Sequence, residues 1–156
     1  MKLAIASDHR GYELKKHLIE HLDKRQNSLL RMTDLGPLLP LPVDYPDFAE
    51  KLGKFIIQGF ATRGILICGS GVGASIAANK IPGIRAALCN DVYSAHQGVE
   101  DDDMNVLVLG SGSVGPLLAQ DLVHAFLQAH FQHEERHMRR LRKIALLEER
   151  LTQRSA

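Results

Sequence analysis

A cysteine at the head of a glycine-rich run is the feature of the sequence best suited to chemistry. The run that follows Cys68 consists of Gly69, Ser70, Gly71, Val72, Gly73 and Ala74. Such a loop turns tightly and exposes backbone N–H groups, which bind a phosphate or an oxyanion that develops during a reaction. The same field favours the thiolate of a neighbouring cysteine, which makes Cys68 a candidate base or nucleophile. The alternative is that Cys68 is simply a small buried residue.

A second pair of reactive side chains, Asp8 and His9, follows the apolar run Leu3–Ala6. A carboxylate in this position can accept a hydroxyl proton, and an imidazole can donate to an oxyanion or a phosphate. The competing interpretation is that Asp8 only caps the helix that follows.

An acidic run, Glu100–Asp103, precedes another apolar segment. Consecutive acids usually form a solvated turn, and this is the favoured interpretation here. The alternative is that one of these carboxylates takes part in acid–base chemistry.

Arginines near the C-terminus form the last candidate group. Arg136 and Arg140 are four residues apart, so on a helix they share a face and together suit one phosphate. The alternative is a surface helix with ion pairs to Glu134, Glu135 and Glu148.

Short apolar runs alternate with amphipathic segments, which indicates strands that alternate with helices. Strands are predicted at 3–6, 32–35, 64–68, 85–89 and 105–109. Helices are predicted at 12–26, from just after Asp44 to about 56, and at 71–80, 114–129 and 134–154. The alternation predicts an α/β fold with three layers, Rossmann-like or flavodoxin-like, in which helices cover both faces of a five-stranded parallel sheet. In such sheets, ligands bind beyond the carboxyl ends of the strands.

The length of 156 residues predicts one domain over 1–156. The helix at about 134–154 extends beyond what the sheet needs. We expect it to pack on a partner subunit in a homodimer or tetramer, although it could instead fold back on its own domain.

The charge balance disfavours several classes of protein. Nineteen Lys and Arg against eighteen Asp and Glu leave a net charge of +1, so neither nucleic acid nor a membrane surface is an expected partner. The apolar run at the N-terminus stops at Asp8, too early for a signal peptide. With only Cys68 and Cys89, a disulfide framework is not expected, and we predict a reduced, cytoplasmic location.

Taken together, these motifs resemble the type B ribose-5-phosphate isomerase family, which also contains galactose-6-phosphate and allose-6-phosphate isomerases. The resemblance extends to about Leu147 and rests on the segments 6–11, 43–46, 64–73, 77–80, 83–86 and 135–137. It implies an aldose–ketose isomerase that needs no metal or cofactor, with a site between two subunits.

The resemblance also implies a role for each candidate residue. Cys68 would move a proton between C2 and C1 of the open-chain sugar phosphate, and Ser70 would hydrogen-bond near the carbonyl. The backbone N–H groups from Gly69 to Ala74 would hold the enediolate oxygens. Asp8 would help to open the furanose ring. The residues that would hold the phosphate, partly from the neighbouring subunit, are His9, Arg136 and Arg140.

Two positions depart from the family pattern. The family usually has His-Asn where this chain has Asp101 and Asp102. Asp101 can act as a general base on a hydroxyl, but an ionised carboxylate cannot donate a proton to the ring oxygen; Asp102 keeps the substrate-binding position. Where the family often has a phosphate-binding arginine, this chain has Gly112, and the backbone of 110–112 is expected to bind phosphate instead.

The leading hypothesis is an isomerase that converts ribose 5-phosphate to ribulose 5-phosphate. Another pentose or hexose phosphate, such as allose 6-phosphate or galactose 6-phosphate, is an alternative substrate. A sugar-phosphate-binding protein without catalysis is a third hypothesis. The fourth is a nucleotide-binding module, since the glycine run overlaps a dinucleotide fingerprint and Asp91 lies about 20 residues downstream.

Overall fold

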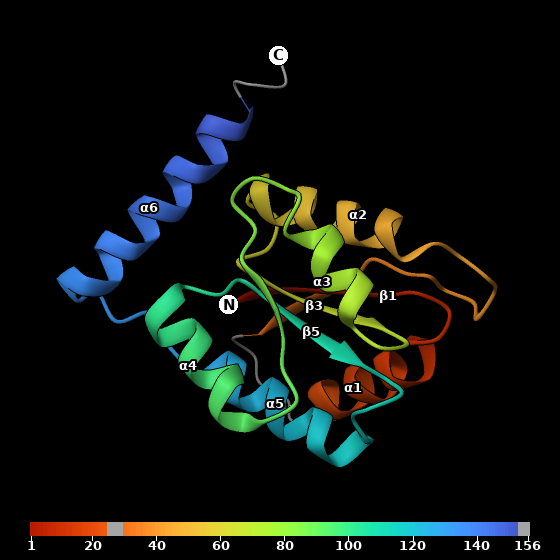
Figure 1. Cartoon of the computed structure of the whole chain (residues 1–156). Helices are drawn as coiled ribbons and strands as arrows, with labels where there is room; N and C mark the ends of the chain where they lie inside the picture. The colour runs from red at the N-terminus through yellow and green to blue at the C-terminus, as the bar shows by residue number, and fades with distance from the viewer. Residues whose placement is uncertain (25–29, 153–156) are drawn as a thin grey trace.

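The structure, a computed structural model, describes residues 1–24 and 30–152. Its strands are β1 (Lys2–Ser7), β2 (Arg31–Asp34), β3 (Arg63–Cys68), β4 (Ala86–Leu88) and β5 (Val106–Gly110). Its helices are α1 (Tyr12–Lys24), α2 (Tyr45–Ile57), α3 (Val72–Ala78), α4 (Val92–Asp102), α5 (Pro116–Gln128) and α6 (Glu135–Thr152). Figure 1 shows α2 and α3 on one face of the sheet and α1, α4 and α5 on the other. The predicted three-layer α/β fold is therefore confirmed.

All neighbouring strands pair in parallel, in the order β2-β1-β3-β5-β4. The chain moves from β1 outward to β2 and then returns to add β3 on the other side of β1. The carboxyl ends of β1 and β3 therefore form a topological switch point, the place where open α/β sheets bind ligands. The candidates Asp8–His9 and Cys68–Gly71 follow these two strands directly.

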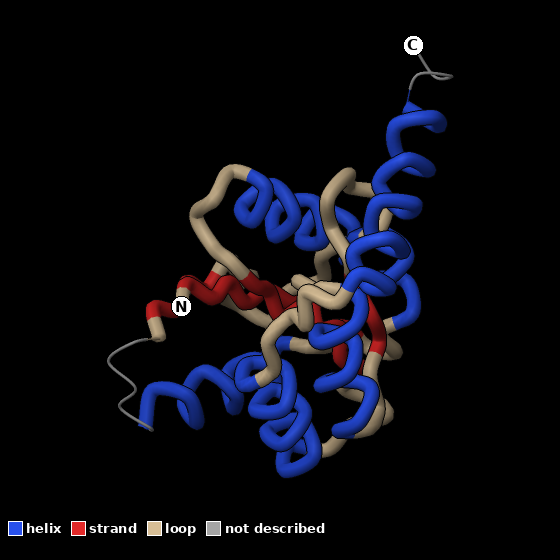
Figure 2. The backbone as a smooth tube through the Cα atoms, turned by 90° about the vertical axis from the view of Figure 1, so that its left-hand side faces the viewer, coloured by secondary structure: helices blue, strands red, loops and turns tan. Residues whose placement is uncertain are grey.

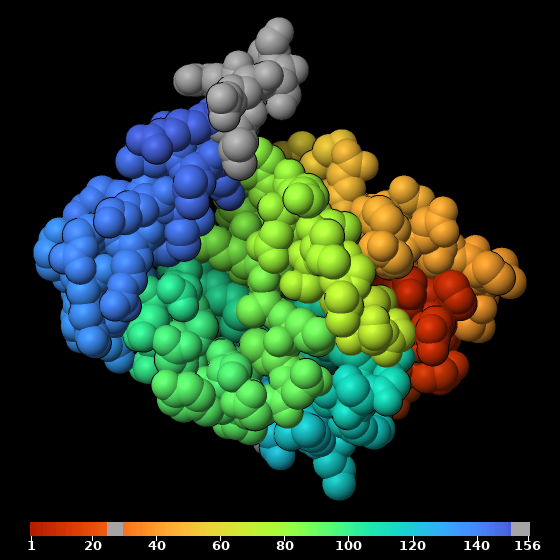
Figure 3. All heavy atoms as spheres, in the orientation of Figure 1, coloured from red at the N-terminus to blue at the C-terminus, as the bar shows by residue number. Residues whose placement is uncertain are grey.

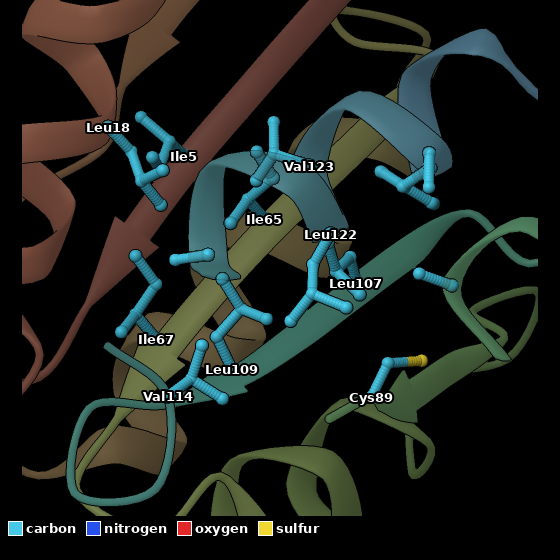
Figure 4. Close-up of a cluster of buried hydrophobic side chains, with 14 of the residues drawn as sticks. Ile5, Leu18, Ile65, Ile67, Cys89, Leu107, Leu109, Val114, Leu122 and Val123 are labelled. Carbon is cyan, nitrogen blue, oxygen red and sulfur yellow. The ribbon is translucent and has the colours of Figure 1, made fainter. Parts of the chain in front are cut away.

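Two hydrophobic clusters hold the layers together, because alternate residues of a strand point to opposite faces. Ile5, Ile65 and Leu107 point toward α1, α4 and α5, where they pack with residues such as Leu122 (Figure 4). Ala4, Ala6 and Cys68 belong to the smaller cluster under α2 and α3. The central strands β1, β3 and β5 are apolar over most of their length, because both faces of the sheet are covered.

One helix was not predicted. The segment Val92–Asp102 forms α4, whose cap Asp91 accepts a hydrogen bond from the Ser94 N–H. The interpretation of the acidic run as a solvated turn is therefore wrong, since Glu100–Asp102 are the last residues of α4 and Asp103, at φ 48°, ends it. Other elements lie close to their predicted bounds; residues 25–26 and 153–154 of two predicted helices lie outside the described residues.

The last helix, α6, contacts the rest of the chain mainly through α4 and points away from the sheet (Figures 1 and 2). Its first turn is held by His137, which is completely buried, and further along Glu148 accepts a hydrogen bond from the Gly83 N–H. Within the described residues, no helix combines the length and the apolar composition needed to cross a bilayer.

Candidate active site

The loops after β1 and β3 meet at the switch point. The Asp8 N–H donates to the Ile67 carbonyl at 3.0 Å, which continues the pairing of the two strands into the loop. A Cβ on Gly11 would lie 2.5 Å from the same carbonyl oxygen, so only glycine lets the start of α1 come this close to β3. The sequence therefore places Asp8 and His9 beside the glycine loop.

The glycine loop wraps around the sulfur of Cys68. The Gly71 N–H donates to Sγ at 3.1 Å, and Gly71 has φ +80°, a conformation that an L side chain rarely adopts. The Ser70 hydroxyl accepts from the Val72 N–H at 3.3 Å, where α3 begins. Cys68 is 4% exposed and packs in the cluster that includes Ala74, as the interpretation of a small buried residue predicts.

Asp8 and His9 each have a partner in the chain. The Asp8 carboxylate accepts from the Gly11 N–H at 2.8 Å, as the capping interpretation predicts, and the residue is 6% exposed. His9 Nδ1 lies 3.1 Å from the carbonyl oxygen of Val43 and 3.2 Å from its nitrogen. A hollow of about 570 Å³ lies beside this imidazole and is lined by His9, Pro42, Val43, Asp44, Asp47 and Phe48.

The sequence did not predict two residues that cover the glycine loop, Arg10 and Tyr45. Each of them lies against a glycine of the loop, where a side chain would leave no room. A Cβ on Gly69 would lie 2.7 Å from the Arg10 Nε, so the guanidinium rests on this glycine. A Cβ on Gly73 would lie 2.8 Å from the Tyr45 hydroxyl oxygen. Both residues stand within the segments that carry the family resemblance, but only the folded chain shows that they cover the loop.

The loop after β5 supports the glycine loop from the other side. The Ser111 N–H donates to the Cys68 carbonyl and the Gly112 N–H to the Gly69 carbonyl, both at 2.8 Å. These two N–H groups are therefore already used within the protein. The expectation that they bind phosphate in place of an arginine is wrong, because their hydrogen bonds hold the glycine loop instead.

The remaining candidates lie at the opposite edge of the sheet. Because α4 runs back from the carboxyl edge, Asp101 and Asp102 lie near the start of β4, where Arg85 Nε donates to the Asp102 carbonyl at 3.1 Å. The Asp101 carboxylate accepts from Gln97 Nε2 at 2.7 Å and lies 3.4 Å from Nε2 of the buried His137.

The two candidate arginines are also at this edge, on the exposed surface of α6. Arg136 pairs with Glu134 at 2.8 Å, as the surface-helix interpretation predicts. A single chain thus brings together Asp8, His9 and the segment from Cys68 to Ala74. It does not bring Asp101, Asp102, Arg136 or Arg140 to them.

Asp91, the acid that the dinucleotide hypothesis requires, is already occupied. Its two carboxylate oxygens accept from the backbone N–H and the hydroxyl of Ser94, which hold the pKa of Asp91 below its usual value. The carboxylate caps α4 rather than facing a ribose site.

The second cysteine has a different environment. Burial, and to a smaller extent the charge of Asp91, raise the pKa of the Cys89 thiol to about 11. Its Sγ lies 3.8 Å from the Ala87 carbonyl oxygen. Within the part of the chain that the structure describes, no cluster of three or more His, Cys, Asp or Glu side chains could hold a metal ion.

Comparison with known proteins shows which family this chain belongs to. Residues 3–144 match the model of the Ribose/Galactose Isomerase family. Ribose-5-phosphate isomerase B of Escherichia coli is 40% identical over 149 residues, 96% of this chain and 97% of that protein. The structure of ribose-5-phosphate isomerase B from Clostridium thermocellum superposes with a TM-score of 0.91 at 45% identity, and the match covers 97% of this chain and 99% of that one.

A further solved relative, ribose-5-phosphate isomerase B from Mycoplasma genitalium with bound ribulose-5-phosphate, gives a TM-score of 0.86 at 40% identity. That match covers 95% of this chain and 96% of the other. The chain belongs to the Ribose/Galactose Isomerase family and is a sugar-phosphate isomerase of the aldose–ketose type. The resemblance inferred from the sequence motifs is confirmed.

Proposed function

We propose that this enzyme interconverts ribose 5-phosphate and ribulose 5-phosphate in the cytoplasm, through an enediolate and with Cys68 as the base. The observation that carries the proposal is the contact of the Gly71 N–H with the Cys68 sulfur, at the head of a glycine loop placed at the switch point of the sheet. The relative with bound ribulose-5-phosphate supports the choice of substrate.

The proposed proton transfer uses the loop in two ways. The Cys68 thiolate takes the proton from C2 of the open-chain aldose and returns it to C1, while the proton of the C2 hydroxyl passes to O1 and Ser70 hydrogen-bonds near the carbonyl. Negative charge moves to the enediolate oxygens, which the backbone N–H groups from Gly69 to Ala74 are proposed to stabilise; of these, the Gly71 and Val72 N–H groups already donate to the Cys68 sulfur and the Ser70 hydroxyl and must turn to the substrate. Gly73 and Ala74 lie in the first turn of α3, where N–H groups have no acceptor within the helix.

Ring opening and phosphate binding require further groups. Asp8 is the proposed acceptor of the anomeric hydroxyl proton during ring opening, while the ring oxygen takes a proton from water as its bond to C1 breaks; Asp101 is proposed as a second general base on a hydroxyl. His9, Arg136 and Arg140 are proposed to hold the phosphate, with Asp102 also binding the substrate. Asp101, Asp102 and the two arginines lie at the far edge of the sheet, so they must come from a second copy of the chain.

Exposed apolar side chains support a homodimer, or a tetramer built from such dimers. Val72 and Ile76 of α3 are 52% and 59% exposed, and Leu147 of α6 is 58% exposed. A groove of about 420 Å³ runs between α6 and β4; Ile84, Met104, Ile144 and Leu147 are among its lining residues. Figure 3 shows the face on which α6 and the segment around β4 adjoin. Apolar surface of this kind is typical of an interface, and a two-fold dimer would supply the far edge of each chain to the other site.

A substrate panel tests the proposed function. Ribose 5-phosphate, allose 6-phosphate and galactose 6-phosphate are incubated with the enzyme in deuterated water, and ketose formation is followed by NMR. We expect ribose 5-phosphate to react with the largest kcat/KM and its product to carry deuterium. A larger kcat/KM for either hexose phosphate would show that the pentose assignment is wrong. Saturable binding of all three sugars without isomer formation would show that catalysis has been lost.

A further inference from the structure

Arg10 is an exposed cation that lies directly over the glycine loop. A Cβ on Gly69 would lie 2.7 Å from Nε, 2.8 Å from Cζ and 2.9 Å from Nη1 of this arginine. The guanidinium can take this position only because residue 69 has no side chain. Among the described residues, no carboxylate lies within ion-pair distance of Arg10. Its charge is therefore available to a ligand at the mouth of the loop.

The loop after β5 fixes this position but brings no charge of its own. The Ser111 hydroxyl donates to the Arg10 carbonyl at 2.9 Å, and the Gly112 N–H donates to the Gly69 carbonyl at 2.8 Å. A Cβ on Gly112 would lie 3.1 Å from the Gly69 oxygen, so residue 112 and Arg10 adjoin the same glycine. Residue 112 is a glycine and brings no charge to the glycine loop, whereas the Arg10 guanidinium lies against Gly69.

The other side of the same rim is acidic. The hollow beside His9 is lined by Asp44 and Asp47. A nearby ammonium, that of Lys15, is held by both oxygens of Asp34 at 2.7 and 2.9 Å. A phosphate dianion held by His9 also faces these two carboxylates, and a guanidinium fork that donates two hydrogen bonds to the phosphate offsets their repulsion.

We infer that Arg10 binds the phosphate of the substrate and supplies, from the loop after β1, the positive charge that Gly112 does not. Arg10 then sets the preference for phosphorylated over unphosphorylated sugars. This inference rests on the proposed function, since it takes a sugar phosphate as the substrate of the Cys68 loop. The phosphate is anionic before the reaction begins. Its interaction with Arg10 is therefore present in the ground state and in the transition state alike.

Such an interaction changes KM rather than kcat. Arg10→Gln keeps a polar side chain and removes the charge. We expect KM to rise about ten- to a hundredfold, which is what the loss of one hydrogen-bonding charged group costs in binding. The expected change in kcat is less than about twofold. The inhibition constant of inorganic phosphate should rise by the same factor as KM. Arg10→Lys should fall between Arg10→Gln and the parent enzyme, because lysine keeps the charge without the fork.

Lys16→Gln is the matched control, because it removes the same charge from an exposed position on α1. It should leave KM and phosphate inhibition unchanged. In the Arg10→Gln background, Gly112→Arg should recover part of the phosphate affinity, since it returns a cation to the same corner.

Two results would overturn the inference. A fall in kcat with unchanged KM and unchanged phosphate inhibition would mean that Arg10 acts on the reacting carbons. Parent-like constants for Arg10→Gln would mean that it binds nothing. Calorimetric titration with inorganic phosphate gives the same comparison without turnover. If no sugar phosphate is isomerised, the proposed function fails, and the loss or retention of phosphate affinity in Arg10→Gln still decides the role of Arg10.

Discussion

The two edges of the sheet carry different parts of the candidate site. At the carboxyl edge, Asp8 and the Cys68 loop are tied together by backbone hydrogen bonds between β1, β3 and the loop after β5. At the amino edge, Asp101 is bound by Gln97 within α4, and Arg136 pairs with Glu134 just before α6. The carboxyl edge holds Cys68, the proposed base, and its glycine loop without the arginine pair, and the amino edge holds that pair and Asp101 without the loop. We infer that neither edge is a complete site and that two copies of the chain combine them.

Subunit complementation tests this division with the largest expected effect. Cys68→Ala and Arg140→Ala should each lower kcat/KM by about a hundredfold or more. When the two inactive variants are unfolded and refolded together, about half of the dimers should contain one of each, and one site in each of these is intact.

Activity should therefore recover to about a quarter of that of the parent enzyme. Recovery no greater than the sum of the separate variants would show that both residues act within one chain, or that Arg140 is not part of the site.

Gly71→Ala tests whether the shape of the loop is essential at the carboxyl edge. A Cβ on this residue would lie 2.4 Å from the Leu88 Cδ1, and the backbone is in the left-handed region. We expect kcat to fall about tenfold or more and the protein to lose about 1–3 kcal/mol of unfolding free energy.

Gly115→Ala is the control, since a Cβ there meets nothing within 4 Å and its φ is −75°. Both variants are compared by urea unfolding and steady-state kinetics. Equal behaviour of the two would contradict the requirement for glycine at position 71.

Asp101→Asn examines the amino edge. This carboxylate lies against the buried His137, whereas its neighbour Asp102 is exposed. The substitution should lower the free energy of unfolding by about 1 kcal/mol, and Asp102→Asn should lower it by less than about 0.5 kcal/mol. Since Asp101 is also proposed as a general base, kcat should fall as well; a loss of stability with unchanged kcat would limit Asp101 to holding α6 in place.

The alkaline stability of the protein should depend on Cys89, with the smallest expected effect. Its pKa in the folded chain is about 11, above the ordinary value of 9.0, because burial and Asp91 disfavour the thiolate. The contribution of the protonated Cys89 thiol to the stability of the fold is therefore complete below about pH 9 and is lost as the pH rises through about 11. Because a single thiol titrates, we expect the Tm to fall by about a few degrees over this interval. The fall should be smaller in Cys89→Ala. An identical pH dependence in both proteins would contradict this environment.

The sequence predicted most of the fold because its signals are local. The run of apolar residues in β3 and the alternation of strands and helices need no knowledge of distant contacts. By contrast, α4 was missed although Asp91 and Ser94 form a cap at its start, because Asp91 was considered as a ribose ligand and the acids at its end as a turn.

The site could be predicted only in part for a similar reason. The Cys68 loop is continuous in sequence, so its glycines identify it. The contact of Arg10 with Gly69 exists only because β1 and β3 are neighbours, and the use of the Gly112 N–H by Gly69 depends on the pairing of β3 with β5. Spacing along the chain carries no signal for either contact.

The most direct test of the account follows the proton that Cys68 is proposed to move. The exchange of the C2 hydrogen of ribose 5-phosphate with deuterated water is measured for the parent enzyme, Cys68→Ala and Cys89→Ala. If Cys68 is the base, Cys68→Ala should lose exchange and turnover together by about 10²–10⁴-fold, while Cys89→Ala keeps both. Exchange at the parent rate in folded Cys68→Ala would contradict the proposed mechanism.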